Sequence, residues 1–268
     1  MNSGLTLYLN GSRQTSLLLL GQRGLPMLDE AKQAAARLLD TNIERLDAHP
    51  DYLYVTNTDK KSIGVEDVLI IQDKASLKPS VSETICIIVD GIDLMTEAAQ
   101  NKLLKLVEEG ECILIFVAYS DAVLPTIKSR VRIIEYRPLG MEQFNSFCTA
   151  HQLSEAEMLY FITGGCPGLA LEYPGATDIF KQVKASVNTN PLNLYNILHL
   201  VKEKDKDNFY LNYPELTDKL FKLIGNETSS VETLRAVSDA LINMGLGNYS
   251  KDDFFGDIVA IVESLRRE

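Results

Sequence analysis

The chain has 268 residues, of which 46% are hydrophobic and 24% charged, ordinary values for a globular protein with room for two or three domains. A net charge of -11 argues against a wide, non-specific nucleic-acid-binding face. No apolar run approaches the ~20 residues of a membrane-spanning helix. The N-terminus shows no signal-peptide pattern, so we expect a cytoplasmic location.

The four cysteines are scattered along the chain without any C-x-x-C pair. Two of them, Cys86 and Cys112, lie within apolar runs, where a free cysteine behaves as a small hydrophobic residue. We therefore expect neither disulfides nor a metal site.

The first half of the chain, up to Pro138, alternates short apolar runs with helical segments. Continuous apolar runs separated by amphipathic helices are typical of a parallel sheet covered on both faces. A helix is expected at residues 29–39, and Thr96 is placed to cap another after the third run. The expected strands are residues 15–20, 52–56, 84–89, 112–118 and 131–136.

The second half has helical periodicity throughout. Ser154, with Glu157 three residues later, forms the capping-box pattern of a helix start. The predicted fold class is therefore α/β followed by all-α. We expect three domains: an α/β domain at 1–138, a small helical domain at 139–175 and a helical domain at 176–268.

A glycine turn between the first strand and the first helix has the layout of a phosphate-binding loop, G-x-x-x-x-G-K-[ST]. Gly21 matches the first glycine, and Gly24 is the loop's other glycine. The second glycine, the lysine and the hydroxyl residue are replaced by Pro26, Met27 and Leu28. Methionine and leucine can neither reach phosphates nor hold Mg²⁺. Taken alone, such a glycine pair is more commonly a simple turn.

Three further segments carry a family resemblance. The apolar run at 85–89 ends in Asp90, as a Walker B strand does, although Gly91 replaces the usual glutamate. The sequence LMTEAAQNKLLKLVEE follows at 94–109, and LPTIKSRV follows at 124–131. This order strongly resembles the bacterial clamp-loader subunits of DNA polymerase III, which are AAA+ proteins.

Within that family the segments at 49–52, 64–68 and 165–171 most resemble the delta prime branch, and the resemblance covers roughly residues 15–172. The chain also departs from the family. Only fourteen residues precede Thr15, so the usual first helix should be nearly absent, and the family's zinc insertion is missing. Tyr119 stands at a sensor position that usually holds a small polar residue.

The resemblance implies an AAA+ fold: a doubly wound, parallel five-stranded sheet, a small helical lid domain and a C-terminal helical collar. It implies a subunit without ATPase activity or cofactor of its own, joined with gamma/tau and delta subunits in a hetero-pentamer. That ring would load the sliding clamp onto primer–template DNA. Arg130 would be an arginine finger acting in trans on a neighbouring ATPase subunit, with Ser129 orienting it or merely capping a turn. The degenerate ATP site would stay empty, leaving Asp90 as a capping residue at a strand end.

Two alternatives remain for the function: a self-sufficient AAA+ ATPase with an atypical loop, and a diverged stand-alone AAA+ scaffold. A basic cluster also allows two interpretations. It could approach nucleotide or DNA phosphate at an interface, or it could be a solvated face. Its members are Lys128, Arg130, Arg132 and Arg137.

Overall fold

The structure is a computed structural model that describes residues 2–11, 15–56, 63–109 and 112–172. The chain divides into two compact units, residues 1–138 and 139–268. Of the second unit, the described part is 139–172. The expected boundary at residue 175 and the expected collar at 176–268 lie outside the described residues.

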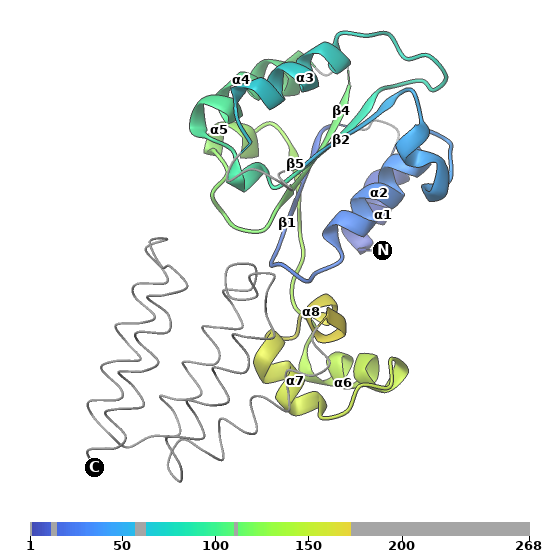
Figure 1. The fold of residues 1–268 in the computed structure, drawn as a ribbon, viewed down its shortest axis with the longest axis vertical. Coiled ribbons are helices and arrows are strands. Elements are labelled where there is room, and N and C mark those ends of the chain that lie inside the picture. Colours follow the sequence, from blue (N-terminus) through green and yellow to red (C-terminus); the bar gives the residue numbers. More distant parts are fainter. Residues whose placement is uncertain (1, 12–14, 57–62, 110–111, 173–268) are drawn as a thin grey trace, which may run out of the picture. The chain divides into compact units, whose positions relative to one another are not determined.

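The first unit is built on a parallel sheet that has five strands within the described residues, in the order β2-β3-β4-β1-β5 (Figure 1). The predicted five-stranded parallel sheet is therefore confirmed. Strands β1, β3 and β4 are almost wholly buried, which explains their continuous apolar sequences. The strands are β1 Leu17–Leu20, β2 Tyr52–Val55, β3 Cys86–Asp90, β4 Ile113–Ala118 and β5 Arg132–Glu135.

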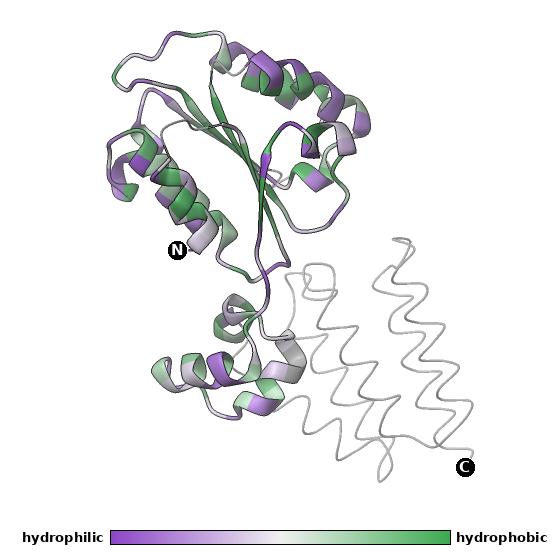
Figure 2. Ribbon diagram, turned by 180° about the vertical axis from the view of Figure 1, so that it is seen from behind, coloured by the Kyte–Doolittle hydropathy of each residue, from purple (hydrophilic) through white to green (hydrophobic). Residues whose placement is uncertain are grey.

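Helices cover both faces of this sheet (Figure 1). One face carries α1 (Ser3–Leu9) and α2 (Met27–Leu38), and the other carries α3 (Val65–Ala75), α4 (Glu97–Glu109) and α5 (Pro125–Lys128). Figure 2 shows the strands largely hydrophobic and the helices mixed. Alternate strand residues pack against α3, α4 and α5 to form a core that includes Leu18, Ile87, Leu114, Phe116, Val68, Ile71, Leu103 and Ile127. Two short 3₁₀ helices, η1 (Ile43–Ala48) and η2 (Ile92–Leu94), complete the unit.

A short N-terminal helix is present, so the expectation that almost no helix precedes residue 15 is wrong. Helix α1 is capped by Asn2, whose Oδ1 accepts a hydrogen bond from the Gly4 amide at 2.8 Å. Leu5 is fully buried, and the buried Tyr8 donates its hydroxyl to the Thr15 carbonyl at 2.6 Å. Seven residues suffice for this helix because it is held by tertiary packing and not by its own length.

Helix α4 follows the expected pattern. The Thr96 hydroxyl accepts a hydrogen bond from the Ala99 amide at 3.2 Å, which confirms the predicted cap. Ala99, Leu103 and Val107 are buried on the face that meets the sheet. The last turn of this helix carries Glu108.

The described part of the second unit consists of α6 (Met141–Ala150), α7 (Ala156–Thr163) and α8 (Pro167–Glu172). Phe144 is central to its core, packing edge-on against Tyr160 with ring centroids 5.4 Å apart. The capping box predicted at Ser154 is wrong: Glu155, in the left-handed region with φ 62°, takes the N-cap position instead. Among the described residues, no helix has both the length and the apolar character needed to cross a membrane.

Candidate functional site

The loop that the sequence likens to a phosphate-binding loop places apolar side chains in the core. A side-chain Cβ at Gly21 would lie 2.9 Å from the Met27 sulfur and 2.9 Å from the Tyr136 Cβ, so this glycine is needed for close approach. Met27 occupies the lysine position of the loop pattern and is fully buried. An apolar side chain thus fills the space beside Gly21 at the start of α2.

The loop amides are also engaged within the loop. The Leu25 amide donates to the Gln22 carbonyl at 3.3 Å, and the Met27 amide donates to the Leu25 carbonyl at 2.8 Å. Pro26, at the N-cap of α2, has no amide hydrogen to donate. A phosphate-binding loop turns its amides toward the ligand. Here Gly24, with φ 81°, serves the turn itself, and the neighbouring Leu28 is half-buried.

Two tyrosines hold Asp90, the aspartate at the position likened to Walker B, at the carboxyl end of β3. The Tyr119 hydroxyl donates to Asp90 Oδ1 at 2.7 Å, and the Tyr54 hydroxyl donates to Asp90 Oδ2 at 2.9 Å. Burial first, and then the Asp90 carboxylate, raise the pKa of Tyr119 well above its usual value. Burial likewise raises the pKa of Tyr54, to about 12, with Asp90 adding to the shift and a hydrogen bond with Thr56 opposing it. Both phenols are therefore neutral donors at pH 7.

The expected role of Asp90 as a cap is not what the contacts show, because its carboxylate oxygens are bound by tyrosine hydroxyls. Asp93 instead fixes the following loop: it accepts hydrogen bonds from the Tyr119 amide at 3.2 Å and the Ser120 hydroxyl at 2.8 Å. The glutamate position of the Walker B pattern is Gly91, in the left-handed region with φ 85°. A glutamate there would be strained, and its Cβ would lie 3.2 Å from Leu94 Cδ1.

Arg130 lies directly after α5, and its guanidinium is held on one side by its own chain. Its Nε donates to Glu108 Oε1 at 2.6 Å. Its Nη1 donates to the Thr126 carbonyl at 2.9 Å and to the Ser129 hydroxyl at 3.2 Å. The Ser129 hydroxyl in turn donates to the Thr126 carbonyl at 3.1 Å, so this serine both closes the turn and contacts the arginine.

The ion pair between Arg130 and Glu108 is open to solvent, with the two side chains 40% and 52% exposed. Exposed pairs of this kind contribute only ~0.2–1 kcal/mol to folding stability. The contact therefore matters chiefly for the orientation of the guanidinium. Sequence reasoning missed this partner, although the segment containing Glu108 was part of the family resemblance.

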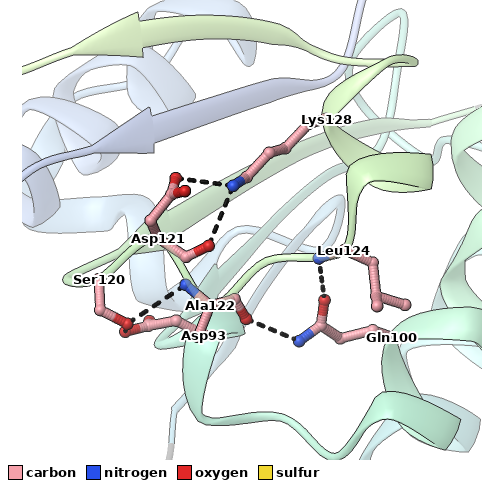
Figure 3. Close-up of polar contacts among 7 residues, drawn as sticks. All are labelled: Asp93, Gln100, Ser120, Asp121, Ala122, Leu124 and Lys128. Carbon is pink, nitrogen blue, oxygen red and sulfur yellow. Dashed lines mark hydrogen bonds and ion pairs between the residues drawn. The ribbon is translucent and has the colours of Figure 1, made fainter.

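Gln100 ties α4 to the loop that leads into α5 (Figure 3). This side chain is 4% exposed. Its Oε1 accepts from the Leu124 amide at 2.8 Å, and its Nε2 donates to the Ala122 carbonyl at 3.2 Å. Asp121, in the same loop, pairs with Lys128 at 2.6 Å. The elements that carry Glu108 and Arg130 are thus joined through the buried Gln100 side chain.

Arg130 and the loop that begins at Gly21 lie at opposite ends of the parallel strands. In the parallel pairing of β1 with β5, Arg132 lies opposite Leu17 and Glu135 lies opposite Leu20. Gly21 follows the end of β1, whereas Arg130 precedes the start of β5. The three residue steps from the level of Leu17 and Arg132 to the level of Leu20 and Glu135 alone span about 10 Å, at ~3.3 Å per residue. In the described part of the chain, the Arg130 guanidinium and the loop after β1 therefore do not come together.

The basic cluster is balanced by neighbouring acids. Lys128 pairs with Asp121, Arg130 with Glu108, and Arg137 with Glu135 at 3.1 Å. The guanidinium of Arg132 lies 6.0 Å from the centroid of the Tyr8 ring. These contacts favour the interpretation of a solvated, charge-paired face. Within the described ranges, no group of three or more His, Cys, Asp or Glu side chains could hold a metal ion.

Comparison with known proteins finds similarity to subunits of DNA polymerase III. A family model described as DNA polymerase III, delta subunit, matches residues 7–140, which is half of the chain. The chain is 39% identical over 79 residues to the DNA polymerase III subunit gamma/tau of Mycobacterium tuberculosis, a match covering 28% of this chain and 14% of that protein. It is 33% identical over 89 residues to the DNA polymerase III subunit delta' of Haemophilus influenzae, covering 32% of this chain and 27% of that protein. Each match thus spans less than a third of the relative.

A solved structure has a similar fold. The DNA polymerase III gamma subunit-related protein of Thermotoga maritima superposes with a TM-score of 0.57 at 17% identity. The superposition covers 98% of this chain and 99% of that one. At this identity the likeness concerns the fold alone.

Proposed function

We propose that this chain, which belongs to the DNA polymerase III delta subunit family, is a clamp-loader subunit that hydrolyses no ATP itself. In this proposal Arg130 acts in trans, as an arginine finger that stabilises charge on the γ-phosphate of ATP bound to a neighbouring subunit. A finger supplied across an interface can contribute about 10³- to 10⁵-fold to the rate. Arginine suits this task because its planar guanidinium is always charged and offers several donors.

One observation carries the proposal. Arg130 precedes β5, so it lies at the amino ends of the strands, whereas the loop after β1, where a nucleotide would bind, lies at their carboxyl ends. An arginine placed there lies too far from the loop after β1 to serve a nucleotide bound at that loop. It is half-exposed, so a phosphate on another subunit can approach it. The position thus supports action across an interface.

The packing of the degenerate site supports the absence of ATP hydrolysis. Hydrolysis on this fold requires a lysine at the phosphates, a hydroxyl on Mg²⁺ and a carboxylate that positions water. Met27 is buried where the lysine would stand, and Gly91 holds the position of the water-positioning carboxylate. Asp90 remains, but both of its carboxylate oxygens accept tyrosine hydroxyls.

The proposed partners follow from the relatives, whose names are DNA polymerase III subunits gamma/tau and delta'. We infer that the chain joins gamma/tau and delta subunits in a five-membered ring. In this ring the C-terminal helical collar, at 176–268, would hold the subunits together, and residues 139–175 would form the lid domain. The ring would act on the sliding clamp and on primer–template DNA, and this chain would reach both through the assembly.

Co-assembly tests the partner proposal. We expect the purified chain, mixed with gamma/tau and delta subunits of its own organism, to elute with them as one complex in size-exclusion chromatography. The complex should contain one copy of this chain, measurable by multi-angle light scattering. If the chain elutes alone under conditions in which gamma/tau and delta bind each other, the stand-alone scaffold is the better description.

Calorimetric titration with Mg-ATP tests the proposed empty site. We expect no heat of binding up to millimolar nucleotide, because the lysine, the hydroxyl and the loop amides that hold phosphate are replaced or used internally. The gamma/tau subunit, titrated under the same conditions, is the positive control. Micromolar affinity for the isolated chain would favour the atypical ATPase over the proposal.

A further inference from the structure

We infer that Glu108 is a positioning residue that sets the direction of the Arg130 guanidinium; this inference rests on the proposed function. A guanidinium has five N–H donors in one plane. Three of them are used within the chain, by Glu108, by the Thr126 carbonyl and by the Ser129 hydroxyl. Among the described residues, Nη2 donates to no acceptor, so its two N–H groups remain for a ligand.

The three contacts come from two directions. Glu108, in the last turn of α4, holds the Nε edge. The turn of α5 holds Nη1 through Thr126 and Ser129. Because the guanidinium is planar, fixing Nε and Nη1 fixes the plane and the direction of Nη2. The buried Gln100 side chain, which links α4 to Leu124, keeps the two supports in register.

The contact between Glu108 and Arg130 acts by fixing the orientation of the guanidinium. An unsupported arginine samples many rotamers, and it must lose that freedom each time it engages a phosphate. An arginine already held in one orientation loses less, and a small misplacement of a catalytic group can cost as much as ~10²-fold in rate. The Glu108 carboxylate also places a negative charge near the incoming phosphate. That charge is 52% exposed and lies on the Nε side, so solvent screens it. We therefore expect positioning to outweigh repulsion.

Two substitutions separate these effects in the assembled clamp loader. We expect Glu108→Ala to lower the kcat of the clamp- and DNA-stimulated ATPase about ten-fold, with the KM for ATP unchanged because the partner binds the nucleotide. Glu108→Gln keeps an acceptor oxygen for Nε and should stay within about three-fold of the wild type. Glu109→Ala is the matched control, since that neighbouring carboxylate pairs with Lys105 instead.

Arg130→Ala, assayed in parallel, distinguishes a failure of the positioning role of Glu108 from a failure of the finger role of Arg130. If it lowers kcat while Glu108→Ala does not, the positioning role is wrong and the finger remains. If neither variant lowers kcat in a complete ring, the proposed function fails and the inference fails with it. A rise in kcat for both Glu108 variants would show that repulsion dominates and would overturn the positioning role. With Arg130→Ala already present, Glu108→Ala should have no further effect.

Discussion

The Arg130→Ala subunit is expected to assemble into the ring normally and to slow ATP turnover at the site it serves by about 10³- to 10⁵-fold. Assembly is spared because the side chain is 40% exposed and its ion pair with Glu108 contributes little to folding. Turnover falls because alanine leaves the charge that develops on the transferred phosphoryl group without a donor. Rapid-quench measurement of one turnover, with clamp and primed DNA present, isolates this site from any others in the ring.

Two companion variants define the cause of that loss. Arg137→Ala removes the same charge from the same basic cluster, at an exposed pair with Glu135, and should leave turnover unchanged. Arg130→Lys keeps the charge but loses the planar fork, and should stay nearly as slow as alanine. Normal turnover of Arg130→Ala in a complete ring would remove the finger role. Equal loss in Arg137→Ala would point to general electrostatics instead.

The proposed loss of nucleotide chemistry would have a structural counterpart in this chain. A working site would keep polar groups free for phosphate and Mg²⁺. Here Met27 is fully buried beside Gly21, and the hydroxyls of Tyr54 and Tyr119 bind Asp90. Groups that would wait for a ligand are instead satisfied within the fold, which removes the cost of leaving them unpaired. Of the residues at the proposed degenerate site, Met27 belongs to the core, whereas Tyr54, Asp90 and Tyr119 are partly buried.

The sheet could be predicted from sequence because burial on both faces leaves a direct signal. Each of the five apolar runs up to Pro138 became a strand, with ends within two residues of the expected ones. The Thr96 cap was equally readable, because a cap depends on residues close in sequence. The helix at 3–9 was missed, because its stability comes from burying Leu5 and Tyr8 against distant elements.

The side-chain contacts of the site were beyond sequence reasoning for a similar reason. Glu108 and Arg130 are 22 residues apart and meet only because α4 and α5 pack together. Tyr54, Asp90 and Tyr119 were closer to prediction. Each lies at or just past the carboxyl half of a strand, and in a parallel sheet those ends share one edge. What the sequence could not indicate was that the tyrosines turn their hydroxyls onto the aspartate.

Asp51 presents the largest expected effect on stability. This residue is 1% exposed, directly before β2. Its Oδ1 accepts the Ser80 amide at 2.6 Å, and its Oδ2 accepts the amides of Val81 and Ser82, both at 2.8 Å. Burial raises the pKa of Asp51, but the amides of Ser82, Ser80 and Val81 outweigh it, with help from His49, and hold the pKa below its usual value. The carboxylate therefore anchors the loop between α3 and β3.

We expect Asp51→Asn to lower the free energy of unfolding by about 3 kcal/mol at pH 7, because the amide group faces buried N–H donors and cannot accept from all three. Because the pKa of Asp51 is lower in the folded state, its carboxylate stabilises the fold fully at pH values above the unfolded-state pKa of ~3.9. This stabilisation is lost as the pH falls through the folded-state pKa. Urea titrations should thus show the full difference at pH 7 and a narrowing one below about pH 4. In the Asp51→Asn variant, hydrogen exchange of the Ser80, Val81 and Ser82 amides should be faster than in the wild type. Glu83→Gln removes an exposed carboxylate from the same loop and should change neither the free energy of unfolding nor the exchange rates. If the stability difference between wild type and Asp51→Asn stayed constant down to pH 2, the ionised Asp51 carboxylate would not be the anchor of this loop.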